Sequence, residues 1–133
     1  MFRTLIAVAL AFSLAACAWY GEAPPEDIDK AAGLFYQRLA EADYDAIYED
    51  TAKGFKDTKT RAEIVDSLTQ LAAHGKVQQF TRISGGAEGE GGNARVFAVY
   101  TTRFEKAVGN LTIHFVDESG EWKLIGFALK LRG

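Results

Sequence analysis

Apolar residues in the first half of the chain recur at steps of three and four positions, which is the period of an amphipathic helix. The pattern predicts a first helix that starts near Pro25, where acidic residues suit the positive end of the helix dipole. A short second helix should follow the N-cap residue Asp43 and end near Gly54. The buried stripe of the first helix should be Ile28, Ala31, Ala32, Phe35, Leu39 and Ala42.

A third helix is predicted after a second polar break. Thr60 and Glu63 have the spacing of a capping box, in which each side chain satisfies a free backbone N–H at the helix N-terminus. Gly75 stands where a left-handed C-terminal cap belongs. The apolar positions between them share one helix face: Ile64, Val65, Leu68, Leu71 and Ala72.

From Lys76 onward the apolar period changes from 3.6 to 2, which is typical of strands. Four strands are expected, at residues 76–84, 93–105, 109–117 and 121–131. Because all helices precede all strands, the chain is predicted to be an α+β domain. Its three N-terminal helices should pack on a curved, mainly antiparallel four-stranded sheet.

Alternation along the strands assigns one face of this sheet to the core. A three-residue loop, Glu118 to Gly120 with Gly120 left-handed, should join the last two strands. A register slip of one residue would place polar side chains in the core instead. The side chains expected on the core face are Val96, Ala98, Tyr100, Phe104, Leu111, Ile113, Phe115, Ile125, Phe127 and Leu129.

The opposite face should also carry apolar side chains, edged by Arg95, Arg103 and Lys123. A contiguous apolar patch on a domain surface usually marks an interaction site, so this face is a candidate interface, most simply for a homodimer. Two alternatives would remove the patch: the N-terminal tether folds over it, or the register shifts by one. The candidate interface residues are Phe97, Val99, His114, Val116, Trp122 and Leu124.

The N-terminal residues 1–16 read as a secretory signal, with a positive charge at Arg3 followed by an apolar run and small residues. The residues Leu14-Ala15-Ala16-Cys17 resemble the lipobox of bacterial lipoproteins. That resemblance implies cleavage before Cys17 and lipidation of its thiol. The alternatives are an ordinary signal peptide cut after Ala18 and an uncleaved membrane helix, although the apolar run is shorter than the ~20 residues that a span needs.

The resulting organisation is a signal peptide at 1–16, a lipidated cysteine and tether at 17–25, and one domain at 26–133. Two or more acyl chains hold a protein stably at a membrane, so the expected location is the cell envelope. Ala18 is not the aspartate of lipoproteins retained at the inner membrane, which favours the outer membrane, facing the periplasm, in a cell that has one.

The composition limits the partners. Cys17 is the only cysteine, so the lipidated protein has no disulfide. The net charge is −3, and it becomes one unit more negative when Arg3 is removed. This balance argues against nucleic acid as a partner. His74 and His114 lie on different predicted elements with no adjacent cysteine or histidine, so neither a metal nor another cofactor is predicted.

The short helix that begins Asp43-Tyr44-Asp45, and the final strand Gly120-Glu121-Trp122-Lys123-Leu124-Ile125-Gly126-Phe127, resemble the nuclear-transport-factor-two-like, cystatin-like cone fold. More narrowly, the chain is similar to small bacterial lipoproteins of unknown function on that fold. The likeness spans nearly the whole chain after the tether. Such motifs report architecture, and architecture alone does not determine function.

Enzymes of this fold, such as ketosteroid isomerases and dehydratases, place an acid, a base and a tyrosine inside the cone. Asp43, Asp45 and Glu105 are the available carboxylates, but no residue matches an isomerase pattern. The tyrosines read either as hydrogen-bond donors in a pocket or as core residues with satisfied hydroxyls. The residues that would line a pocket for a small apolar ligand are Tyr36, Tyr48, Phe55, Tyr100 and Phe104.

Three functional hypotheses remain open from the sequence. The leading one is a membrane-anchored envelope lipoprotein that acts as a non-catalytic interaction or ligand-binding module, with an envelope protein or its own copy as partner. The second is a small-molecule enzyme, similar to an isomerase or dehydratase, that works inside the cone. The third is a structural component of the envelope, which the sequence does not separate from the first.

Overall fold

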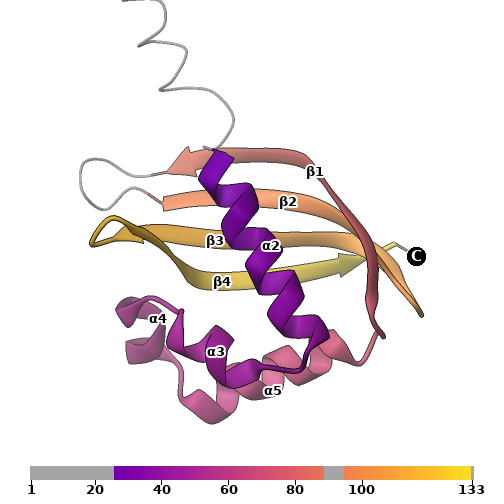
Figure 1. The fold of residues 1–133 in the computed structure, drawn as a ribbon, viewed down its shortest axis with the longest axis horizontal. Coiled ribbons are helices and arrows are strands. Elements are labelled where there is room, and N and C mark those ends of the chain that lie inside the picture. The colour runs from indigo at the N-terminus through magenta and orange to yellow at the C-terminus, as the bar shows by residue number, and fades with distance from the viewer. Residues whose placement is uncertain (1–25, 89–94, 133) are drawn as a thin grey trace, which may run out of the picture.

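The computed structural model describes residues 26–88 and 95–132 and shows an α+β fold with an open, antiparallel four-stranded sheet (Figure 1). The signal peptide, Cys17 and the tether lie outside the described residues. The described helices are α2 (Glu26–Ala40), α3 (Tyr44–Glu49), α4 (Lys53–Thr58) and α5 (Arg61–Ala72). The strands are β1 (Val77–Glu88), β2 (Arg95–Phe104), β3 (Val108–Glu118) and β4 (Glu121–Leu131).

The predicted helix ends are confirmed where the sequence carries capping chemistry. The Asp43 carboxylate accepts a hydrogen bond from the Ala46 N–H at 3.3 Å, at the start of α3. Thr60 and Glu63 form both bonds of the capping box that begins α5. Gly75 follows α5 with a φ of +93°, a conformation that glycine adopts without steric cost. Local side-chain chemistry therefore determines where these helices begin and end.

The prediction of three helices is wrong for the described residues: the second helix, expected to end near Gly54, ends at Glu49 as α3, and the unpredicted helix α4 follows. The break comes where the chain turns to pair with β4. Leu124 donates its N–H to the Asp50 carbonyl at 3.3 Å, and its carbonyl accepts the Ala52 N–H at 2.8 Å. Thr51 and Leu124 thus form a short parallel bridge. Backbone groups committed to a strand cannot also continue a helix.

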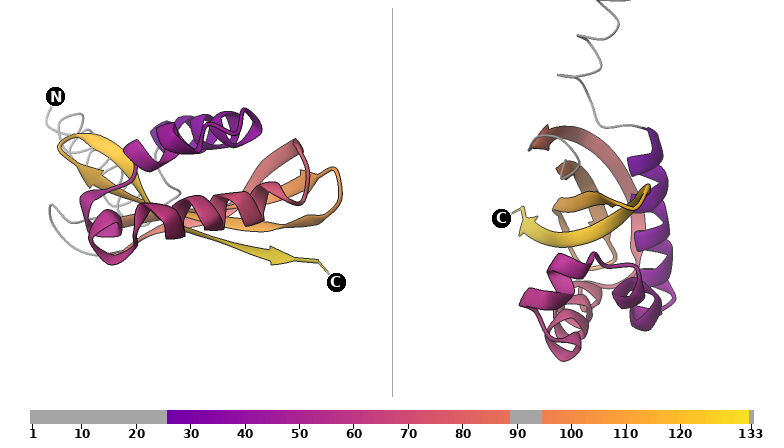
Figure 2. Two further views of the ribbon diagram at one scale, coloured as in Figure 1. Left: turned by 90° about the horizontal axis from the view of Figure 1, so that it is seen from below. Right: turned by 90° about the vertical axis from the view of Figure 1, so that its left-hand side faces the viewer.

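The strands follow one another in the order β1-β2-β3-β4, each antiparallel to the next. Helix α2 crosses one face of the sheet diagonally, and α3, α4 and α5 lie beyond its β4 edge (Figure 1). The sheet is strongly curved, with α2 on one side of it (Figure 2, right). The face away from α2 is called the far face below.

The core lies between α2, the flanking helices and the near face of the sheet. Phe35 of α2 meets Phe127 of β4 with ring centroids 5.7 Å apart, so residues far apart in sequence close the core together. The predicted core positions of β2 and β3 are confirmed, since all of them are buried. The buried apolar cluster contains Ile28, Ala32, Phe35, Tyr36, Leu39, Ile47, Ile64, Leu68, Leu71, Val96, Ala98, Tyr100, Phe104, Leu111, Ile113, Phe115 and Leu124.

The predicted face assignment is wrong for the first half of β4. The β3–β4 register shifts between His114 and Phe115, so that Phe115 pairs with Leu124 and Ile125 is an extra residue. A bulge of this kind reverses the faces of all residues on one side of it. Leu124 is consequently only 4% exposed, and Trp122 packs against the core. Neither residue belongs to the far face, where the sequence placed them.

The turn between β3 and β4 is also tighter than predicted. Glu118 pairs with Glu121, which leaves a two-residue turn in which Ser119 and Gly120 have φ values of +57° and +83°. Two consecutive positive φ values are those of a type I′ turn, whose twist matches that of a hairpin. The Asp117 carboxylate accepts the Gly120 N–H at 3.0 Å and stabilises it. The left-handed Gly120 is confirmed, but the three-residue loop is not.

Candidate functional site

The five predicted pocket residues are not brought together in one cavity. Tyr36, Tyr100 and Phe104 are buried in the core, where neighbouring side chains fill the space around them. Tyr48 and Phe55 are only partly buried, on the separate elements α3 and α4. The interior that the sequence offered as a ligand pocket is therefore divided between core packing and a surface region.

The hydroxyl of Tyr36 is held inside the core by Thr102. The two hydroxyl oxygens are 2.7 Å apart, and Thr102 itself donates to the Tyr100 carbonyl at 3.2 Å. A threonine hydroxyl has one hydrogen, so Tyr36 is the donor of the shorter bond. Burial raises the pKa of Tyr36 well above its ordinary value of 10.0, and the contact with the Thr102 hydroxyl offsets that rise only in part. Tyr36 is a structural donor at neutral pH.

A second buried hydroxyl reaches an acid that the sequence analysis did not single out. Tyr100 donates to the Asp29 carboxylate at 2.7 Å, and Arg82 of β1 lies 3.5 Å from the same oxygen. Burial, followed by the hydrogen bond to Asp29 and its negative charge, raises the pKa of Tyr100. In the sequence, Asp29 is one of several acidic residues near the start of the first helix, where the helix dipole explains an acidic residue without any hydrogen-bond partner.

Near the surface, Tyr48 contacts two cationic side chains, and Phe55 lines a groove. Lys56 and Arg61 lie over the Tyr48 ring, at 5.1 and 5.7 Å from its centroid. Phe55 lines a groove of about 330 Å³ between α4 and the far face. The other lining residues of this groove are Ala52, Gly54, Thr58, Arg95, Val116, Glu118 and Ile125.

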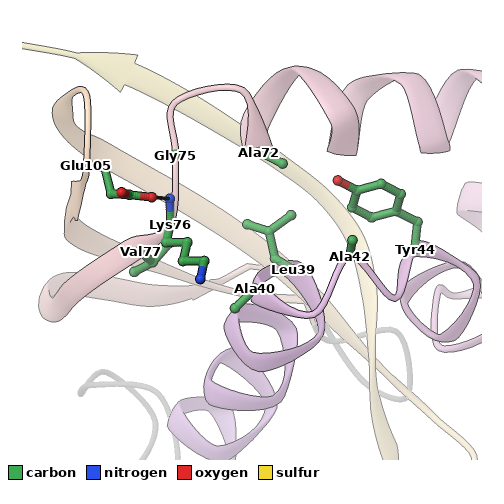
Figure 3. Close-up of a pocket in the computed structure, with 9 residues that line it drawn as sticks. All are labelled: Leu39, Ala40, Ala42, Tyr44, Ala72, Gly75, Lys76, Val77 and Glu105. Carbon is green, nitrogen blue, oxygen red and sulfur yellow. Dashed lines mark hydrogen bonds between the residues drawn. The ribbon is translucent and has the colours of Figure 1, made fainter.

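A separate pocket of about 220 Å³ lies where α2 and α5 end beside the start of β1 (Figure 3). Its apolar lining includes Leu39 and Val77, and its polar groups come from Tyr44, Lys76 and Glu105. The Glu105 carboxylate accepts the Lys76 N–H at 2.7 Å, shown as the dashed line in Figure 3. A small apolar ligand in this pocket would contact the apolar lining residues and one carboxylate, that of Glu105.

The candidate carboxylates do not form an acid–base pair with a tyrosine in the described structure. Glu105 is exposed, and Figure 3 shows it at the opposite end of the pocket from Tyr44. Asp45 is exposed and pairs with Arg61, while Asp43 caps α3. General acid–base catalysis needs both groups within reach of the same reacting atom, and these carboxylates serve structural contacts instead.

The far face keeps four of the six predicted interface residues: Phe97, Val99, His114 and Val116. Phe97 and His114 are a cross-strand pair with ring centroids 6.1 Å apart. Glycines flank this pair, since Gly86 pairs with Phe97 and Gly126 with His114. A Cβ atom at Gly86 would lie 3.1 Å from the Phe97 ring, so the glycine lets the ring lie flat on the sheet. All four side chains are half-buried.

Among the described residues, no group of three or more histidine, cysteine, aspartate or glutamate side chains is arranged to hold a metal ion. None of the helices in that part of the chain has the length and apolar character needed to cross a membrane. No known protein family, and no curated protein, was found to match this chain.

Proposed function

We propose that this chain is a lipid-anchored envelope protein whose domain binds another protein without catalysing a reaction. The observation that carries the proposal is the sequence Leu14 to Cys17, which follows a charged and then apolar N-terminus. Lipidation of Cys17 would leave a short tether before α2 begins at Glu26. In a cell with an outer membrane, the domain would face the periplasm from that membrane.

The binding function, rather than a catalytic one, is supported by how the polar groups of the domain are used. The buried tyrosine hydroxyls donate to Thr102 and Asp29. Glu105 accepts a backbone N–H, and Asp45 pairs with Arg61. Each of these contacts stabilises the fold, so within residues 26–88 and 95–132 the enzyme hypothesis has no acid and base that share a pocket.

We further propose that the fold is the cystatin-like cone. The curved antiparallel sheet with one long helix across its face supports this assignment (Figure 1). Glycine and aromatic residues in the final strand, together with the aspartate–tyrosine start of α3, are the sequence features that agree with it.

The far face is the proposed interface, and a second copy of the chain is its simplest partner. Phe97, Val99 and Val116 form its apolar centre, and Arg95 and Arg103 are exposed beside them. An apolar centre with a charged rim is the usual anatomy of a protein–protein interface.

Cysteine cross-linking in membranes tests this interface, because the only native cysteine is expected to carry lipid. Val99→Cys in the full chain should give a dimer band on a non-reducing gel after mild oxidation. The matched control Thr69→Cys, at an exposed site of α5, should remain a monomer, as should the parent chain. A cross-linked product of a different mass would identify an envelope partner instead of a second copy. Monomeric Val99→Cys under all conditions would contradict the far face as an interface.

A further inference from the structure

The C-terminal half of β4 is an open sheet edge. Arg132 donates its N–H to Val108 at 2.9 Å, which fixes the phase of the β3–β4 ladder. In an antiparallel ladder alternate residues direct their backbone groups toward the neighbouring strand. Phe127, Leu129 and Leu131 therefore direct their N–H and C=O groups away from β3. No other described residue forms a backbone hydrogen bond with these groups.

The first half of β4 and the β1 edge of the sheet are less able to accept an added strand. The first half of β4 is covered, since Leu124 bonds to Asp50 and Ala52. The β1 edge is interrupted by register shifts between Val77 and Gln79 and between Arg82 and Ser84. Bulges of this kind are a common means of preventing strand addition. In the segment from Gly126 to Leu131 no described residue hydrogen-bonds to the outward backbone groups and the register does not shift, so this segment remains able to accept a strand.

A groove accompanies this edge. A cavity of about 280 Å³ lies between α5 and β4. Ser67, Gln70 and His74 form its helical side, while Phe127 and Leu129 belong to its strand side. Figure 2 (left) shows the C-terminal end of β4 clear of α5, and Leu131 near that end is 46% exposed. An added strand would find backbone partners on β4 and space for a side chain against α5.

The charges beside the edge indicate what the added strand should carry. Lys130 and Arg132 are exposed, and neither forms an ion pair with another described residue. Lys130 pairs with Asn110, so it belongs to the far face rather than the groove side. A second copy paired antiparallel about Leu129 would set the two Lys130 side chains diagonally across the new junction, where like charges repel.

We propose that the Gly126–Leu131 edge binds an extended segment of another protein, one that alternates apolar and acidic residues, as a fifth strand. The apolar side chains of the segment lie in the groove between α5 and β4, and its carboxylates contact Lys130 and Arg132 on the far face. Main-chain hydrogen bonds supply the affinity, and the alternating side chains supply the specificity. This surface is distinct from the Phe97–Val99–Val116 interface, and its test does not depend on that interface.

Full-length protein purified in mild detergent can be titrated with a short blocked peptide that alternates valine and glutamate, followed by fluorescence anisotropy. The control is a peptide of equal length that alternates valine and lysine. The acidic peptide should bind saturably, and hydrogen exchange of the 126–131 segment should slow in its presence. The basic peptide should do neither.

Two variants separate the backbone and charge contributions. Leu131→Pro removes one outward N–H without touching the bonds to β3, and should weaken binding about fivefold relative to Leu131→Ala, which keeps that N–H. Lys130→Glu should weaken the acidic peptide about fivefold and improve the basic one. The midpoint of thermal unfolding of each variant, followed by circular dichroism, shows that the domain remains folded.

Three results would overturn the proposal. The first is absence of saturable binding of the acidic peptide to wild-type protein. The second is binding that is unchanged in both Leu131→Pro and Lys130→Glu. The third is concentration-dependent protection of the 126–131 segment without any peptide, because this would assign the edge to a second copy of the chain.

Discussion

Leu124 and Ile125 are neighbours in β4 with opposite environments, and this contrast tests the bulge. Leu124 lies in the core, whereas Ile125 is a half-buried bulge residue beside the α4 groove. Leu124→Ala should lower the free energy of unfolding by about 2–5 kcal/mol, as truncation of a buried leucine does. Ile125→Ala should cost roughly 1 kcal/mol, the usual effect of a single substitution. Urea denaturation of both variants measures the difference; equal costs, or a larger cost at Ile125, would show that the bulge is misplaced.

The two buried tyrosines predict how the stability depends on alkaline pH. Their folded-state pKa values are raised above the ordinary value of 10.0, so their stabilisation is complete below that pH and is lost as the pH rises toward the folded-state values. Above pH 10 the unfolded chain releases protons that the folded chain retains. Each tyrosine then lowers stability by up to about 1.4 kcal/mol per pH unit.

Tyr36→Phe should remove one of these two contributions. Its free energy of unfolding should fall less steeply between about pH 10 and 12 than that of wild type. At neutral pH the variant should be less stable by about 0.5–1.5 kcal/mol, because the bond to Thr102 is lost. Denaturation across this pH range checks both effects. The double variant Tyr36→Phe, Tyr100→Phe should show the weakest dependence of the free energy of unfolding on pH. Identical slopes in all three proteins would contradict the assignment of both tyrosines as buried donors.

At the scale of elements, α5 shows how much a cap contributes. Thr60→Ala removes the hydroxyl that accepts the Glu63 N–H, and should cost about 0.5–2 kcal/mol of stability. The matched control is Thr69→Ala in the exposed middle of the same helix, which should be neutral or slightly stabilising because alanine has the higher helix propensity. Thermal unfolding of both variants is sufficient. A Thr69→Ala variant less stable than Thr60→Ala would argue against the capping box.

Elements with local signals could be predicted from the sequence, and those fixed by distant contacts could not. The capping residues and Gly75 indicate the bounds of α5 to within a few residues, and alternation indicates all four strands. The division between α3 and α4 depends on backbone bonds from Asp50 and Ala52 to Leu124, far along the chain. The bulge at Ile125 likewise has no signal in a strand whose residues are apolar on both faces.

For the whole molecule, the same reasoning explains which parts of the candidate site were predicted. Phe97, Val99, His114 and Val116 share the far face because regular alternation holds along β2 and β3. Leu124 and Trp122 leave that face because the bulge intervenes. The predicted ligand pocket fails because Tyr36 and Tyr100 find their partners within the core, and aromatic residues that suit a pocket also suit a core. The β4 edge becomes visible only when the strand order is known.

The lipid anchor at Cys17 can be tested by measuring the mass of the N-terminal peptide of the protein isolated from membranes. That peptide should begin at Cys17 and carry a diacylglyceryl group on the thiol. Cys17→Ser should lack this modification and no longer partition with membranes. An unmodified peptide that begins at Trp19, recovered from soluble wild-type protein, would contradict the anchor.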